Sequence, residues 1–332
     1  GSVMTPGYPV FGVICDISQI LARLTKKVKL RVRLKGGQNM GDFISWNSQP
    51  LEDWANKYAK GKFIDLGGRN TYYIEKGEGE AIILLHGFFY DSYLWDSNIE
   101  VLAEHFKVYA LDLWGFGYST REPLDYGYQL YSDQVLMFMD ALNIKQASLA
   151  GQSMGGGTAI YFCLKHRQRV NKLILVDAAG VPHGLPLTGK FFNLPGVGEF
   201  FLGLNNNLIR RKNLADVFIH NKNLITDNYF ENVTRFHKIK DTTDCMLTIL
   251  RKQFFHTLSN QLRQLSQLDV PILIIWGKED KAIPWQKGEE MHKILKGSRF
   301  EILESAGHVP NYECAEEFNK LALDFLQEMN SR

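Results

Sequence analysis

The chain has 332 residues, 45% of them hydrophobic, and a formal net charge of +2. This length can bury a large core, and so small a charge gives no argument for nucleic-acid binding. The four cysteines lie far apart without metal-ligand spacing, which is typical of reduced thiols in a cytoplasmic protein. No apolar run reaches the roughly 20 residues that a membrane span needs.

Residues 1–61 stand apart from the regular pattern that follows and are predicted to form an N-terminal arm. Residues 10–24 have the apolar spacing of an amphipathic helix, and the lysines and arginines over 26–35 have no acid between them. Such a basic segment can bind an anionic membrane, although a charge run is more often a solvated face. We therefore expect residues 10–35 to contact the protein's own body, a second subunit in a homodimer, or a membrane peripherally. A short helix near 50–60 leads into the core.

From residue 62 onward, short apolar strands alternate with helices. The predicted strands lie near 62–66, 71–76, 81–85, 107–113, 146–150, 172–177, 271–276 and 299–303. The predicted helices lie near 92–105, 128–142, 156–164, 285–296 and 313–329. This alternation predicts an α/β fold with a mostly parallel sheet of about eight strands and helices on both faces.

Between residues 180 and 268 the alternation stops, and the segment is rich in aromatic residues. Helix-like stretches lie near 198–204, 207–219, 226–237 and 242–258. An insertion between two strands emerges at the carboxyl edge of the sheet, where open α/β sheets keep their sites. We expect residues 180–268 to form a helical cap over a site held by a core of 62–179 and 269–332.

A G-x-S-x-G pentapeptide, residues 151–155, lies where a predicted strand turns into a helix. Gly151 and Gly155 would let strand and helix approach closely, and the turn would expose the hydroxyl of Ser153. The pentapeptide alone is a weak signal because glycine and serine are common. Its position at a strand-to-helix corner makes Ser153 a candidate nucleophile.

Three further residues follow predicted strands in the order that a serine hydrolase requires. His86, followed by Gly87, comes after strand 81–85, Asp280 follows strand 271–276, and His308 follows strand 299–303. A serine hydroxyl is a poor nucleophile and needs a base within hydrogen-bond reach, which in turn needs an acid to orient it. Asp177 also ends a strand and is the alternative acid, but we favour Asp280. We expect His86 to orient the loop that follows it rather than to do chemistry.

The residues from about 62 to 330 resemble the α/β-hydrolase superfamily, and within it capped serine esterases, monoacylglycerol-lipase-like enzymes and meta-cleavage-product hydrolases. The motifs shared with these enzymes are His86-Gly87, Asp112-x-x-Gly115-x-Gly117-x-Ser119, Gly151-x-Ser153-Met154-Gly155-Gly156, Trp276-Gly277-x-x-Asp280 and Gly307-His308. The resemblance implies the α/β-hydrolase fold and a triad of Ser153, Asp280 and His308. It also implies an oxyanion hole made by the backbone N–H groups of Phe88 and Met154, and no metal or organic cofactor.

The chain departs from several branches of the superfamily. Ser153 stands where haloalkane dehalogenases and epoxide hydrolases have aspartate. Carbon–carbon hydrolases of the meta-cleavage type commonly have asparagine before the serine and tryptophan after the histidine, where this chain has Gln152 and Val309. These departures favour ester hydrolysis over carbon–carbon cleavage.

The sequence therefore predicts a serine hydrolase that cleaves carboxylic esters of small to medium acyl chains through an acyl-enzyme, as a carboxylesterase or monoacylglycerol-type lipase does. A carbon–carbon hydrolase of meta-cleavage products is the alternative enzyme. A non-catalytic ligand receptor on the same fold is the alternative from another class, although an intact triad argues against it. The expected partner is a small-molecule ester rather than nucleic acid, and the expected location is cytoplasmic or peripheral to the membrane.

Overall fold

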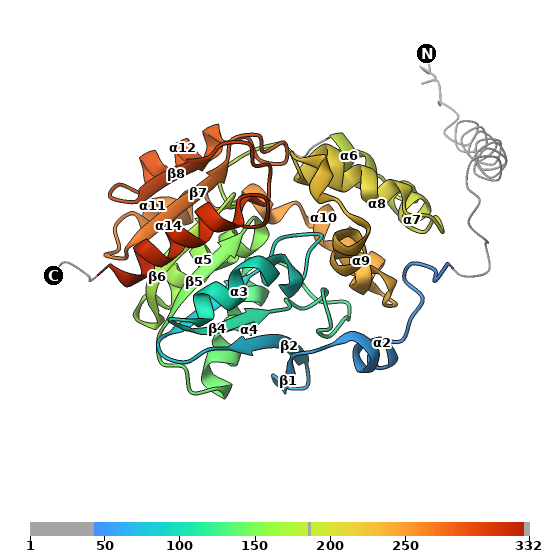
Figure 1. Ribbon diagram of the computed structural model, residues 1–332, viewed down its shortest axis with the longest axis horizontal. Coiled ribbons are helices and arrows are strands. Elements are labelled where there is room, and N and C mark those ends of the chain that lie inside the picture. Colours follow the sequence, from blue (N-terminus) through green and yellow to red (C-terminus); the bar gives the residue numbers. More distant parts are fainter. Residues whose placement is uncertain (1–42, 185–186, 329–332) are drawn as a thin grey trace, which may run out of the picture. The chain divides into compact units, whose positions relative to one another are not determined.

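The computed structural model describes residues 43–184 and 187–328 (Figure 1). The predictions made for residues 10–35 therefore lie outside the described residues. Among the residues described, no helix is both long enough and apolar enough to cross a membrane.

An eight-stranded sheet is the centre of the fold, with strand order β1-β2-β4-β3-β5-β6-β7-β8 (Figure 1). The strands are β1 (Lys62–Asp65), β2 (Asn70–Lys76), β3 (Ala81–Leu85), β4 (Lys107–Leu111), β5 (Ala147–Gln152), β6 (Val170–Val176), β7 (Ile272–Gly277) and β8 (Arg299–Leu303). β1 and β2 form an antiparallel hairpin, β2 pairs antiparallel with β4, and the strands from β3 to β8 pair in parallel. The predicted α/β-hydrolase fold is confirmed.

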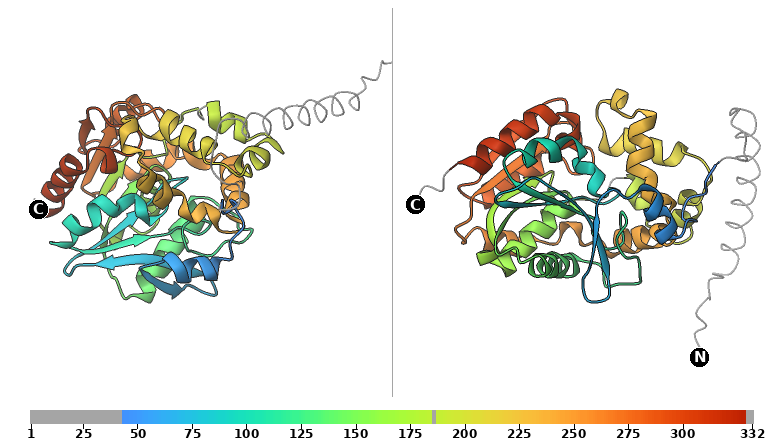
Figure 2. Two further views of the ribbon diagram at one scale, coloured as in Figure 1. Left: turned by 45° about the vertical axis from the view of Figure 1, so that its right-hand side comes forward. Right: turned by 60° about the horizontal axis from the view of Figure 1, so that its bottom comes forward.

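Helices cover both faces of the sheet (Figure 2). The core helices are α3 (Asp96–Ala103), α4 (Tyr128–Ala141), α5 (Met154–Lys165), α12 (Gln286–Ile294), α13 (Pro310–Glu313) and α14 (Ala315–Gln327). α3 packs against α14, and α4 packs against α5 on the opposite face. Because both faces are covered, the central strands are apolar without alternation, and every residue of β5 and β7 is buried.

The segment between β6 and β7 is helical, as predicted, and has no strand in its described part. Its helices are α6 (Leu187–Phe192), α7 (Val197–Leu202), α8 (Leu208–Asn213), α9 (Asp227–Thr234), α10 (Thr242–Lys252) and α11 (Ser259–Leu265). The helix predicted over 242–258 ends early, at Lys252, because Gln253 adopts a left-handed conformation with φ of 51°. We call residues 180–268 the cap.

Residues just before the core pack against the cap. α2 (Leu51–Tyr58) confirms the short helix predicted near 50–60. The indole N–H of Trp54 donates to the carbonyl of Arg235 at 3.0 Å, and that of Trp46 donates to the carbonyl of Asn206 at 3.0 Å. Trp46 and Trp54, in the described part of the predicted N-terminal arm, are therefore hydrogen-bonded to the cap. The exact domain limits stay a prediction.

Candidate active site

Ser153 occupies the corner between β5 and α5, where the sequence placed it. Its φ is 52° and its ψ is −116°, a strained conformation for a residue other than glycine. Backbone hydrogen bonds hold it there: its N–H donates to the carbonyl of Val176 at 2.9 Å, and its carbonyl accepts from Gly157 and Ala179 at 3.1 and 2.9 Å. These hydrogen bonds to the residues on either side of the corner therefore hold Ser153 in its strained conformation.

The two glycines of the pentapeptide are required by close backbone contacts. A Cβ on Gly151 would lie 2.3 Å from the carbonyl oxygen of Gly155, and a Cβ on Gly155 would lie 2.2 Å from that of Leu85. Both distances are far below van der Waals contact. Any side chain at either position would therefore push α5 away from the sheet and move Ser153.

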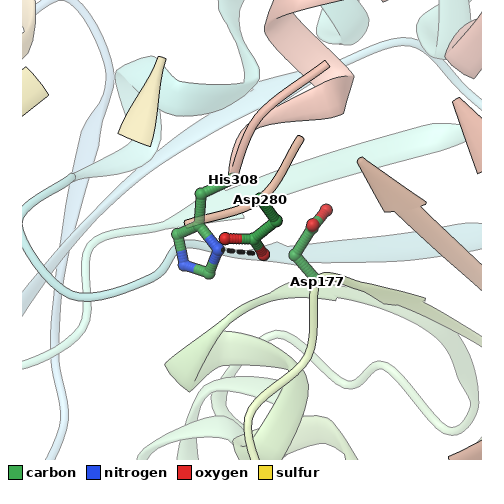
Figure 3. A group of neighbouring side chains, drawn as sticks. All are labelled: Asp177, Asp280 and His308. Atoms are coloured by element: carbon green, nitrogen blue, oxygen red, sulfur yellow. Dashed lines mark hydrogen bonds and ion pairs between the residues drawn. The ribbon is translucent and has the colours of Figure 1, made fainter. Parts of the chain in front are cut away.

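His308 and Asp280 form a buried hydrogen-bonded pair (Figure 3). His308 Nδ1 lies 2.7 Å from Asp280 Oδ2, and Asp280 Oδ1 accepts from the backbone N–H groups of Ala282 and Ile283 at 2.7 and 2.9 Å. In a neutral imidazole this arrangement puts the proton on Nδ1 and leaves Nε2 as the base. The pair therefore has the tautomer that a serine hydrolase uses.

Ser153 and His308 line one pocket, which encloses about 660 Å³ of empty space, part of it open to solvent. Within the described residues no hydrogen bond joins the Ser153 hydroxyl to the imidazole of His308. Such catalytic hydrogen bonds are often long without substrate and shorten when it binds. The structure thus brings the three predicted triad residues to one place.

Asp177, the alternative acid, lies beside this pair. One oxygen from each of the carboxyl groups of Asp177 and Asp280 and a ring nitrogen of His308 lie within 4.8 Å of one another (Figure 3). Asp177 Oδ1 accepts from the backbone N–H of Gly277 at 3.1 Å, while its Oδ2 is buried without a hydrogen bond to any described residue. Burial, and then the charge of Asp280, raises the pKa of Asp177 well above its ordinary value. The geometry therefore favours Asp280 as the partner of His308.

The loop after β3 approaches Ser153 from the other side. A Cβ on Gly87 would lie 2.1 Å from Gln152 Oε1 and 2.9 Å from the Cβ of Ser153, so only glycine fits there. The backbone N–H groups of Phe88 and Met154 donate to no other group in the described chain. Phe88 also lines the pocket. These N–H groups are thus free to serve as the predicted oxyanion hole.

His86 orients this loop, as the sequence predicted. Its Nε2 accepts from the backbone N–H of Leu113 at 2.9 Å, so Nδ1 carries the proton and donates to the carbonyl of Gly87 at 2.8 Å. Burial lowers the pKa of His86 from 6.5 to about 4. Asp112 holds the glycine-containing loop that follows it, because its Oδ2 accepts from the N–H of Tyr118 at 2.7 Å.

The buried neutral state of His86 gives a prediction about pH. The unfolded chain binds a proton at this histidine near pH 6.5, whereas the folded protein does so only near pH 4. The free energy of unfolding should therefore fall as pH drops from 6.5 to 4, by about 3 kcal/mol from this residue. Urea unfolding of wild type and His86→Gln at several pH values checks this. The difference between their unfolding free energies should change with pH in this window, and parallel curves would contradict it.

The cap supplies much of the pocket wall, and sequence reasoning did not identify these residues. The cap residues that line the pocket are His183, Gly189, Phe192, Asn213, Val217, Phe218, Leu250 and Phe255. A second, smaller cavity of about 360 Å³ shares Phe88, Phe192, Asn213 and Leu250 with it. The aromatic richness of residues 180–268 was the only signal in the sequence, and it could not separate pocket wall from cap core.

A strained serine on a strand-to-helix turn lines one pocket with a histidine that is paired with an aspartate, and this is the arrangement that serine hydrolases use. The family model described as "alpha/beta hydrolase fold" matches residues 80–314, and the chain belongs to that family. It is a hydrolase of that fold.

Relatives in sequence and in structure agree with this assignment. The chain is 29% identical over 282 residues to the 2-hydroxymuconate semialdehyde hydrolase of Pseudomonas sp. (strain CF600). This match covers 82% of this chain and 95% of the relative. It is 28% identical to the 2-hydroxy-6-oxo-6-phenylhexa-2,4-dienoate hydrolase of Comamonas testosteroni, with 82% and 96% covered. A solved meta-cleavage product hydrolase from Pseudomonas fluorescens IP01 superposes with a TM-score of 0.71 at 27% identity, covering 81% of this chain and 98% of that one. An esterase from Thermogutta terrifontis, 24% identical with a TM-score of 0.68 and coverage of 81% and 98%, shares the fold.

Proposed function

We propose that this protein is a serine hydrolase that cleaves a carbon–carbon bond in a ring-fission product, a vinylogous diketone of the meta-cleavage type. The observation that carries the serine-hydrolase chemistry is the His308–Asp280 pair, which faces the same pocket as Ser153. The choice of substrate is supported by relatives that match over most of their length and whose names specify such compounds. The ester substrate that the sequence favoured is not confirmed, and these relatives fit the alternative better.

The chemistry follows from the positions of the groups. Ser153 Oγ attacks the ketone carbon of the substrate while His308 Nε2 takes the hydroxyl proton, and the N–H groups of Phe88 and Met154 stabilise the oxyanion. The enol proton of the substrate moves to the carbon next to the ketone before the bond breaks, so that this carbon is sp3 and lies next to a 2-oxo-3-ene. When the tetrahedral adduct collapses, the carbon–carbon bond breaks and its electron pair is delocalised into this conjugated system as a dienolate, which takes a proton from His308. Water, deprotonated by His308, then hydrolyses the acyl-enzyme to a carboxylic acid and free Ser153.

The pocket is suited to an apolar acyl group. Phe88, Phe192, Phe218 and Phe255 contribute aromatic surface, and the polar side chains that line the pocket are Ser153, His308, His183 and Asn213. An aryl or alkyl ketone can place its carbonyl at the polar end and bury its apolar end beneath the cap.

Ester hydrolysis is the second candidate because two side chains differ from the common carbon–carbon hydrolase pattern. Gln152 directs its amide toward the histidine loop, where Nε2 donates to the carbonyl of His308 at 2.6 Å. Val309 is fully buried and presents no polar group beside the histidine. Neither residue offers the side chain that carbon–carbon hydrolases commonly have at these positions, whereas an ester needs only the triad and the oxyanion hole.

A direct comparison of two substrates tests the proposal. Purified protein should bleach the yellow 2-hydroxy-6-oxo-6-phenylhexa-2,4-dienoate with a kcat/KM at least about tenfold above that for p-nitrophenyl butyrate, a difference of about 1.4 kcal/mol in transition-state stabilisation. Turnover of the ester with the dienoate left unchanged would replace the proposal by the second candidate. No turnover of either compound, together with failure of a fluorophosphonate to label Ser153, would instead indicate a receptor.

A further inference from the structure

A cap histidine, His237, is hydrogen-bonded to the loop that carries the proposed oxyanion hole. It lies in the short helical turn η5 (Arg235–Lys238) and is almost fully buried. His237 Nε2 lies 3.0 Å from the carbonyl oxygen of Phe89, and its Nδ1 lies 3.1 Å from Arg210 Nε. A guanidinium can only donate, so Nδ1 accepts and Nε2 carries the proton. His237 therefore donates a hydrogen bond to Phe89, the residue directly after Phe88.

The backbone at Phe89 needs such support. Its φ is 79°, in the left-handed region that a bulky residue rarely adopts. The ring of Phe218 stacks on that of Phe89 at 5.4 Å between centroids, and the imidazole of His237 meets it edge-on at 4.5 Å. All three contacts come from the cap. A strained backbone conformation persists only where surrounding contacts hold it in place. At Phe89 the cap provides many of these contacts.

His237 is itself fixed within the cap by Arg210 of α8. Besides its bond to His237, Arg210 donates from Nη1 to the carbonyl of Leu202 at the end of α7, at 3.0 Å. Its guanidinium lies 3.8 Å from the centre of the Trp46 ring, and no carboxylate pairs with it among the described residues. A continuous series of hydrogen bonds thus runs from α7 through α8 and η5 to the oxyanion loop.

We propose that His237 is a positioning residue, through which the docked cap holds the Phe89 backbone so that the N–H of Phe88 faces the substrate carbonyl. The proposal rests on the proposed function, because it assumes that the Phe88 N–H stabilises an oxyanion. It gives the cap a part in catalysis in addition to covering the pocket, since the oxyanion hole is complete only when the cap is in place.

Two amide variants of His237 test its hydrogen bond to Phe89 separately from its hydrogen bond to Arg210. In His237→Gln the amide can accept from Arg210 and still reach the carbonyl of Phe89, whereas the shorter amide of His237→Asn can accept from Arg210 but cannot reach Phe89. Thr234→Val is the matched control, because it removes a buried hydrogen bond of the same cap, from Thr234 Oγ1 to the carbonyl of Phe230. That bond has no contact with the oxyanion loop.

We expect His237→Asn to lower kcat by about 10- to 100-fold with little change in KM, because a small displacement of one oxyanion donor has effects of this size. His237→Gln and Thr234→Val should stay within about threefold of wild type. Rates are expressed per Ser153 titrated by a fluorophosphonate, so that misfolded protein is not counted. The affinity for phenylboronic acid, which forms a tetrahedral adduct on the serine, should fall in His237→Asn in proportion to kcat.

A kcat per titrated site and a boronate affinity that are both unchanged in His237→Asn would overturn the proposal, even if the variant is less stable. If His237→Asn does not fold, His237→Phe keeps the aromatic contacts without the donor and is measured in the same way. Failure of the proposed function has a different signature, because wild type itself would then leave the dienoate unchanged; if it still turns over the ester, the His237 variants are compared on the ester.

Discussion

Replacing Ser153 with alanine is expected to lower kcat by about 10⁴- to 10⁶-fold, the range found when a serine nucleophile is removed from a triad. The loss should be this large because no other described hydroxyl shares the pocket with His308. The fold should survive, since the strained corner is held by backbone hydrogen bonds to Val176, Gly157 and Ala179 that alanine keeps. Unfolding curves and substrate turnover measured on the same preparation check both points.

Ser148, in the strand that leads to the corner, serves as the control. Ser148 is buried in β5 and does not line the pocket, so Ser148→Ala should keep kcat within about threefold. Covalent labelling by a fluorophosphonate should disappear in Ser153→Ala and remain in Ser148→Ala. Turnover by Ser153→Ala above about one hundredth of the wild-type rate would mean that the nucleophile lies elsewhere.

The sequence predicted the elbow and its partners because their residue types are dictated by local sterics. Gly151 and Gly155 are required by backbone contacts that any Cβ would violate, and the pentapeptide therefore identifies the corner. Asp280 and His308 follow the parallel strands β7 and β8, and the carboxyl ends of such strands meet at one edge of the sheet. The order of these motifs along the chain was therefore enough to predict that their side chains lie close together in the fold.

The cap could not be predicted in the same way, because its contacts join residues far apart in the sequence. His237 and Phe89 are separated by 148 positions, and nothing in the local pattern around either residue indicates their hydrogen bond. In the structure His183 lines the pocket, while His237 is buried against the loop behind it.

The motifs also could not show whether the enzyme cleaves an ester bond or a carbon–carbon bond. Both reactions use the same nucleophile, base and oxyanion hole, and differ in how the leaving group is stabilised. Gln152 and Val309 favoured the ester, yet relatives that match over most of the chain are named as hydrolases of 2-hydroxymuconate semialdehyde and of 2-hydroxy-6-oxo-6-phenylhexa-2,4-dienoate. The two side chains next to the triad and the similarity over the whole fold therefore favour different substrates.

The two aspartates beside His308 are expected to respond very differently to the same substitution. Asp280→Asn should lower kcat by about 10⁴-fold, because an amide facing Nδ1 of His308 favours the tautomer that has its proton on Nε2 and cannot act as the base. Asp177→Asn should keep kcat within about threefold, since Asp177 makes no hydrogen bond to His308 in the described chain. The asparagine can still accept from the N–H of Gly277. Turnover of the dienoate and the ester by both variants tests the assignment, and the reverse order of effects would make Asp177 the acid.

The raised pKa of Asp177 provides an independent check on its role. Its folded-state pKa lies above the unfolded value of 3.8, so the folded protein binds the proton more tightly than the unfolded chain does. The free energy of unfolding of wild type should therefore fall relative to that of Asp177→Asn as pH rises above about 4, until the folded carboxyl ionises. Equal pH dependence of the two proteins would mean that Asp177 is charged in the folded state, and its buried charge beside Asp280 would then need a cation to balance it. A neutral carboxyl, by contrast, leaves Asp280 as the single charge that orients His308 and stabilises its imidazolium during the reaction.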